Sequence, residues 1–97
     1  MIPNSVKVGP EKKDVQFYYE NNTVLIIPSS FLRKKSPSAE NKKNLSDEIS
    51  NKFKNVSIEK IESVGNYAIR IHFSDGHNTG IFSWEYLFSL GKKLNNL

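Results

Sequence analysis

VGNYAIRIHFSDGHNTGIFSWEYLFSLG, residues 64–91, holds in one stretch most of the elements that a small fold needs. From Tyr67 to Phe73 every second residue is apolar, and this period of two predicts a strand with one buried face. The pair Asp75-Gly76 then predicts a tight turn, because glycine adopts the positive φ angles that hairpin turns require. Residues 78–82 return as a short strand, so the stretch predicts a hairpin.

A short helix is predicted directly after this hairpin. Ser83 is a favoured N-cap residue, and apolar side chains follow it at helical spacing. Gly91 is typical of the position at which a helix ends. On the other side, residues 57–64 form the predicted partner of the first strand, joined to it through the turn-forming pair Gly65-Asn66.

The same order of elements occurs earlier in the chain. Residues 15–19 alternate like a strand, residues 23–27 return as a second strand, and residues 28–33 predict a short helix. We therefore expect two related strand-turn-strand-helix units. They predict an α+β fold with a small mixed β-sheet of about five to six strands and two short helices.

The length of 97 residues predicts a single domain, residues 1–97. Its core should cover about residues 15–91, flanked by a loose N-terminal arm with a short edge strand near 5–8 and by a loose last few residues. The absence of cysteine excludes disulfides, thiolate metal sites and cysteine nucleophiles within this chain. No signal peptide or membrane-length apolar run is present, so we expect a cytoplasmic protein without membrane contact.

The positive charge is concentrated in one segment. Residues 33–54 carry seven basic and three acidic side chains, which accounts for the whole net charge of +4. Such a segment could bind nucleic acid. A solvated loop is the favoured interpretation, because no nucleic-acid recognition motif accompanies the charge.

Two short motifs are candidates for a functional site. In Asp75-Gly76-His77 a carboxylate stands near an imidazole, which suits general base catalysis or metal binding, although a plain surface turn is favoured on the motif alone. In the segment 36–40, SPSAE, hydroxyl groups and a carboxylate lie beside cations. It could hold a phosphate, dock a partner or cap the next turn.

LRKKSPSAE, residues 32–40, and the stretch 64–91 closely resemble the gamma-butyrobetaine hydroxylase-like N-terminal domains of small bacterial proteins. The resemblance covers about residues 15–91. It implies a domain of unknown function when free-standing. The same domain is attached to carnitine-pathway dioxygenases, and a version occurs in some iron–sulfur scaffold proteins. The catalytic iron of those dioxygenases belongs to a different domain, which we expect this chain to lack.

The resemblance also implies a position for a metal. In the hydroxylases this domain holds a structural zinc with three cysteines and one histidine, which fall here on Ser36, Ser38, Asn41 and His77. Only the histidine is present, so we expect no hydroxylase-type zinc site. We expect His77 to meet the SPSAE loop in space, with hydrogen bonds to serine oxygens or Glu40 in place of the metal.

The favoured function is a non-catalytic accessory module that docks an unidentified protein partner. A link to iron–sulfur or other metal handling is implied by the resemblance alone. We expect no cofactor. One alternative is a weak divalent-metal site formed by His77 with Asp75 and Glu40, and a second is nucleic-acid binding through residues 33–54, which is less favoured. The predicted interaction surface consists of Ser36, Pro37, Ser38, Glu40, Asp75, Gly76, His77 and Thr79.

Overall fold

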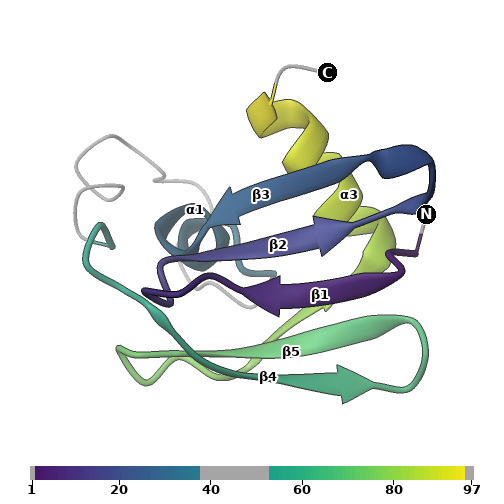
Figure 1. Cartoon of the computed structure of the whole chain (residues 1–97). Coiled ribbons are helices and arrows are strands. Elements are labelled where there is room, and N and C mark those ends of the chain that lie inside the picture. Colours follow the sequence, from purple (N-terminus) through teal and green to yellow (C-terminus); the bar gives the residue numbers. More distant parts are fainter. Residues whose placement is uncertain (1, 38–52, 96–97) are drawn as a thin grey trace.

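The computed structural model describes residues 2–37 and 53–95, with the side chains of the final helix described as far as residue 94. Its described parts form two three-stranded antiparallel sheets and two α-helices (Figure 1). We call β1-β2-β3 the N-terminal sheet and β4-β5-β6 the C-terminal sheet. The strands are β1 (Ser5–Val8), β2 (Asp14–Tyr18), β3 (Val24–Pro28), β4 (Ile58–Val64), β5 (Ala68–Phe73) and β6 (Gly80–Ser83).

The N-terminal sheet forms from two successive hairpins. The predicted edge strand near residues 5–8 is confirmed, because β1 pairs antiparallel with β2 from Ser5 opposite Tyr18 to Val8 opposite Val15. A single-turn 3-10 helix, η1 (Glu20–Asn22), joins β2 to β3. Alternate residues of β2 and β3 point inward, so Val15, Phe17, Leu25 and Ile27 are buried. On the outer face of β3, the apolar residues Val24 and Ile26 are exposed.

The C-terminal sheet contains the predicted strands of the second unit. β4 pairs with β5 up to Val64 opposite Ala68, and the register shifts between Ile58 and Lys60, as it does at a β-bulge. Residues 65–67 form the turn, with Gly65 at a φ of 55°. The inward-facing residues of β5 are buried as the period of two predicts, but Tyr67 lies outside the strand and is 59% exposed.

The two helices differ in length. α1 (Ser29–Lys34) is the short helix that the sequence predicts. α3 (Trp84–Asn95) begins as predicted, since the Ser83 Oγ accepts a hydrogen bond from the backbone N–H of Tyr86 at 3.1 Å. The prediction that it ends at Gly91 is wrong, because the helix continues to Asn95.

Gly91 has a packing role in place of a stop. A Cβ atom on this residue would lie 2.7 Å from the Leu25 Cδ1 atom and 3.1 Å from its Cβ atom. Glycine therefore lets α3 approach β3 closely. The helix packs against β3 of one sheet and β6 of the other, and so connects the two sheets.

The core lies between the sheets and helices. Fourteen buried apolar and aromatic residues form one cluster, to which both sheets and both helices contribute. None of the helices within residues 2–37 and 53–95 is long and apolar enough to cross a membrane. The most completely buried side chains include Phe17, Phe73, Phe82, Leu25, Ile27, Leu32 and Leu87.

The α+β class and the number of strands agree with the prediction, but the strands do not join into one mixed sheet. Each strand pairs antiparallel with the strand next to it in sequence, because short turns connect them. The two units therefore build separate sheets. The apolar faces of the two sheets are buried in one shared core. This core joins the two units, as we had expected a continuous sheet to do.

The two units contact each other reciprocally, because a residue that follows the start of the helix in each unit packs against a strand of the other unit. With an offset of 55 residues, as between Ile26 and Ile81, Ser36 corresponds to Gly91 and Leu25 to Gly80. Gly91 packs against Leu25, and Ser36 packs against Gly80. Each unit thus places the residue seven positions after the first residue of its helix against the return strand of the other unit.

Candidate functional site

Ser36 and His77 meet in space, as expected from the family resemblance. The Ser36 Oγ atom lies 2.9 Å from the His77 Nε2 atom, although the residues are 41 positions apart. Ser36 follows α1 and is only 4% exposed, whereas His77 is half-buried in the turn between β5 and β6. The hydrogen bond therefore connects the end of the first unit to the turn of the second.

An ion pair lies beside this hydrogen bond. The Arg33 Nε atom donates to the Asp75 Oδ2 atom at 2.8 Å, and the two side chains are 16% and 30% exposed. The Asp75 Oδ1 atom accepts a hydrogen bond from the backbone N–H of His77 at 3.2 Å. Arg33 also stacks over the Phe53 ring, with its Cζ atom 4.4 Å from the ring centre. Asp75 thus orients both the arginine and the histidine turn.

Small and aromatic residues form the inner wall of this group. A Cβ atom on Gly80 would lie 2.3 Å from the Ser36 Oγ atom, so glycine leaves the space that the hydroxyl occupies. The His77 ring lies 5.9 Å from the Phe73 ring centre. The Tyr86 hydroxyl donates to the Lys35 carbonyl oxygen and holds the end of α1 against α3. We name Arg33, Ser36, Asp75 and His77 the Ser36–His77 cluster.

The remaining predicted residues divide into two groups. Pro37, Gly76 and Thr79 are exposed around the cluster, and Gly76 adopts a φ of 92°, which explains a glycine at that turn position. Ser38, Glu40 and Asn41 lie outside the described residues. The expected hydrogen bond between His77 and a serine hydroxyl is formed with Ser36.

Sequence reasoning missed the contributions of Arg33 and Gly80. Arg33 was grouped with the other cations of the basic segment, and its partner Asp75 is 42 residues away. Gly80 gave no local signal, since it stands at the start of a strand. The LRKKSPSAE motif contains the arginine, so the family resemblance was the signal that could have placed it.

Within residues 2–37 and 53–95 no three His, Cys, Asp or Glu side chains gather to hold a metal ion. The second histidine is separate from the cluster. His72 Nε2 lies 2.6 Å from Glu62 Oε1 on the C-terminal sheet, and this hydrogen bond is the main reason why the pKa of Glu62 is lowered. His72 is therefore a useful reference for experiments on His77.

The internal repeat shows which part of the cluster is special to the second unit. At the equivalent contact between Gly91 and Leu25, a small residue meets an apolar side chain. At the Ser36–Gly80 contact, the small residue has moved to the strand and a hydroxyl occupies the space. The equivalent contact between Gly91 and Leu25 is close without any polar group. The polar side chains of the Ser36–His77 cluster are therefore not needed for packing alone.

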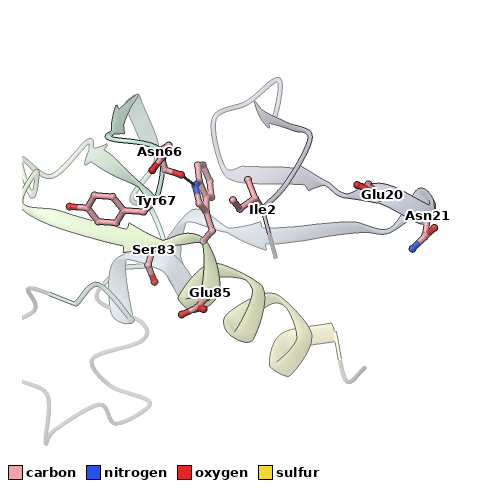
Figure 2. A pocket seen from close by; sticks show the side chains of 8 residues that line it. Ile2, Glu20, Asn21, Asn66, Tyr67, Ser83 and Glu85 are labelled. Atoms are coloured by element: carbon pink, nitrogen blue, oxygen red, sulfur yellow. Dashed lines mark hydrogen bonds between the residues drawn. The ribbon is translucent and has the colours of Figure 1, made fainter.

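A hollow of about 1060 Å³ lies at another place on the molecule. Figure 2 shows Ile2 and Asn66 toward its middle, Glu85 on the first turn of α3, and Glu20 and Asn21 at the far hairpin turn. The hydrogen bond drawn at Asn66 is donated by the Trp84 indole N–H to the Asn66 carbonyl oxygen, at 3.1 Å. The lining residues are Ile2, Glu20, Asn21, Asn66, Tyr67, Ser83, Trp84 and Glu85.

The family model described as gamma-butyrobetaine hydroxylase-like, N-terminal, matches residues 6–88. The fold is similar to the crystal structure of a DUF971-family protein of unknown function from Acidithiobacillus ferrooxidans. That pair shares 30% sequence identity at a TM-score of 0.75, covering 92% of this chain and 91% of that chain. No curated protein matches the chain.

Two NMR solution structures are similar as well. The first is 28% identical, with a TM-score of 0.72, and the match covers 98% of this chain and 76% of that one. The second is 27% identical, with a TM-score of 0.73, and the match covers 96% of this chain and 70% of that one. Both similarities extend over nearly the whole chain described above.

Proposed function

Because the chain belongs to the gamma-butyrobetaine hydroxylase-like N-terminal family, we propose that it is a non-catalytic accessory module that docks a protein partner in the cytoplasm. The observation that carries the proposal is the Ser36–His77 hydrogen bond, which joins two distant motifs directly behind exposed residues. A link to iron–sulfur or other metal handling rests on the family resemblance alone. The solved DUF971-family relative is described as a protein of unknown function.

The surface around the cluster suits recognition by a protein. Pro37 and residues 78–79 are exposed, whereas Ser36 behind them is buried. The Arg33–Asp75 ion pair and the Asp75–His77 hydrogen bond hold the turn in one shape, so little conformational entropy would be lost on binding. Polar, solvent-accessible groups of this kind form the rim of a typical protein–protein interface.

A metal-binding function is the less supported alternative. The His77 Nε2 atom already faces the Ser36 hydroxyl, and Asp75 is paired with Arg33. A metal would have to displace both partners. Nucleic-acid binding through residues 33–54 remains a further alternative, and most of that segment lies outside the described residues.

Site-specific crosslinking tests the docking proposal. A photo-crosslinking amino acid at position 78, in place of exposed Asn78, should yield one discrete adduct in cells that express the protein. The matched control carries the same group in place of exposed Lys7 on β1. We expect the adduct at position 78 only, and we expect Asp75→Asn to weaken it. Equal adducts at both positions, or none at position 78, would contradict the proposal.

A metal titration separates the alternative. Zn²⁺ and Mn²⁺ are added to the free protein while the ring signals of His72 and His77 are followed by NMR. Docking without metal predicts no saturable shift at His77. A stoichiometric shift at His77, with His72 unchanged, would favour the metal site and overturn the preferred function.

A further inference from the structure

We infer that the hollow beside Trp84 is a second binding site, which takes a lysine or arginine side chain from a partner protein. Two of the lining residues, Asn66 and Tyr67, lie in the turn between β4 and β5, at the opposite end of the C-terminal sheet from the β5–β6 turn that carries His77 (Figure 1). β5 begins next to Tyr67, which lines the hollow, and ends at Phe73 near His77. Six strand residues at about 3.3 Å each separate the two sites by roughly 20 Å.

The hollow presents a fixed aromatic ring. The Trp84 indole N–H donates to the Asn66 carbonyl oxygen, and the Trp84 backbone N–H donates to the Tyr67 carbonyl oxygen, both at 3.1 Å. These two bonds hold the half-buried indole in one orientation. A cation that stacks on a tryptophan face gains electrostatic attraction from the ring, and an ordered ring loses little entropy when this happens.

Two carboxylates make the hollow selective for positive charge. Glu20 comes from the turn between β2 and β3, and Glu85 comes from the first turn of α3, and both are exposed. None of the lining residues is a lysine, arginine or histidine. In a chain of net charge +4, the charged side chains that line the hollow are thus all acidic. Ammonium and guanidinium groups fit that combination.

The start of α3 could instead favour an anion as the ligand, because the helix dipole places partial positive charge there. Two of the backbone donors that could bind an anion are in use. The Trp84 backbone N–H bonds to Tyr67, and the Tyr86 backbone N–H bonds to the Ser83 Oγ atom. Glu85 adds negative charge at the same end. The site therefore favours a cation.

The shape of the hollow favours a protein segment over a small molecule. All its lining residues except Ser83 and Trp84 are exposed, including Ile2 at 64% and Tyr67 at 59%. Sites for small molecules usually enclose most of the ligand. An open site of about 1060 Å³ with exposed apolar side chains at its border suits a longer chain that inserts one basic side chain.

Tryptophan fluorescence tests this inference, because Trp84 is the single tryptophan of the chain. The probes are a capped peptide with two arginines, the same peptide with norleucine in place of arginine, and free argininamide. We expect a saturable change of Trp84 emission with the arginine peptide, and much weaker effects with the other two. Binding of the norleucine peptide with equal affinity, or no saturable change with arginine, would overturn the inference. Equal affinity for argininamide would overturn the assignment to a protein segment.

Matched charge variants complete the test. The double variant Glu20→Gln with Glu85→Gln should lower the affinity for the arginine peptide by roughly two- to fivefold per carboxylate, as expected for exposed ion pairs. The control, Glu11→Gln with Glu59→Gln, changes the net charge equally at exposed positions outside the hollow. Equal weakening by both double variants would contradict the site. The Asn78 crosslink reports on the docking proposal separately, so each proposal can fail alone.

Discussion

Ser36 lies so close to Gly80 that a Cβ atom added to Gly80 would stand 2.3 Å from the Ser36 Oγ atom. The Ser36 hydroxyl therefore occupies the space that is left because Gly80 has no side chain. The hydrogen bond between Ser36 and His77 depends on this contact, because a displaced hydroxyl would no longer lie 2.9 Å from the His77 Nε2 atom. This dependence gives the first prediction.

Gly80→Ala should destabilise the protein by about 1–3 kcal/mol, as overpacking in a buried site does, and should shift the His77 ring signals. Urea unfolding and NMR measure the two effects. Adding Ser36→Ala should restore part of the stability, since the added Cβ atom would then meet no hydroxyl. The control Ile81→Ala changes the exposed neighbour and should leave the His77 signals in place. Full tolerance of Gly80→Ala would show that the contact is looser than described.

A double-mutant cycle measures the strength of the connection between the two motifs. Ser36→Ala and His77→Ala should couple by about 0.5–1.5 kcal/mol, the net value of an ordinary hydrogen bond. Glu62→Ala and His72→Ala provide the comparison cycle on the C-terminal sheet, where the His72 Nε2 atom lies 2.6 Å from the Glu62 Oε1 atom. A coupling of zero between Ser36 and His77 would contradict a structural role for this bond.

Asp75→Asn should reduce stability by about 0.5–1 kcal/mol at low salt, because it removes a partly exposed ion pair with Arg33. Asparagine keeps an oxygen that can accept the His77 backbone hydrogen bond, so the turn itself should persist. Urea unfolding with and without about 1 M NaCl measures the loss, since salt screens the pair. A difference between wild type and variant that does not shrink in salt would rule out the ion pair as its cause.

Tyr19→Phe should raise stability by up to about 1 kcal/mol, because the Tyr19 hydroxyl is buried without a hydrogen-bond partner. Phenylalanine keeps the edge-to-face contact with Phe88. Thermal unfolding measures the change. If the variant is less stable than wild type, the hydroxyl must have a partner in solution.

The same residue predicts a pH dependence. Burial raises the pKa of Tyr19 from 10.0 to about 12, so the unfolded chain loses this proton at a lower pH than the folded chain. The stability contribution is complete below pH 10 and falls as the pH rises toward 12. The difference in unfolding free energy between wild type and Tyr19→Phe should change over that interval and stay constant below it.

Gly91→Ala should destabilise the protein, although alanine is favoured over glycine in a helix by about 1 kcal/mol. The reason is the Leu25 side chain, whose Cβ atom would lie 3.1 Å from the added atom. Chemical denaturation of Gly91→Ala alone and combined with Leu25→Ala measures the effect. The second substitution should make the alanine at position 91 less harmful, and a stabilising Gly91→Ala would contradict the close contact.

The local elements could be predicted from the sequence because their signals are local. The period of two in β5, the turn at Gly76 and the N-cap at Ser83 each involve a few neighbouring residues. The prediction that the helix ends at Gly91 was wrong because the glycine is needed for close packing against Leu25, which lies 66 positions earlier. The division into two sheets was missed for the same cause, since pairing between units has no local signal.

The candidate site was predictable only in part. Asp75 and His77 form a recognisable turn, but nothing near them in sequence points to Ser36. That meeting was expected only through the family resemblance. Arg33 was hidden among other cations, and Trp84, one of the apolar residues that follow Ser83, gave no local sign that it lines a hollow. The residues that were predicted act through neighbours in the sequence, whereas those that were missed act through partners far away in the sequence.

The reciprocal contact between the units has a consequence for how the protein is made. β3 of the first unit is covered by α3, and Gly91 must reach Leu25 to complete that cover. A nascent chain that has emerged only through the first unit still exposes the apolar face of its sheet. Co-translational folding should therefore stall at a loose intermediate until residue 91 has left the ribosome, when both units become compact together.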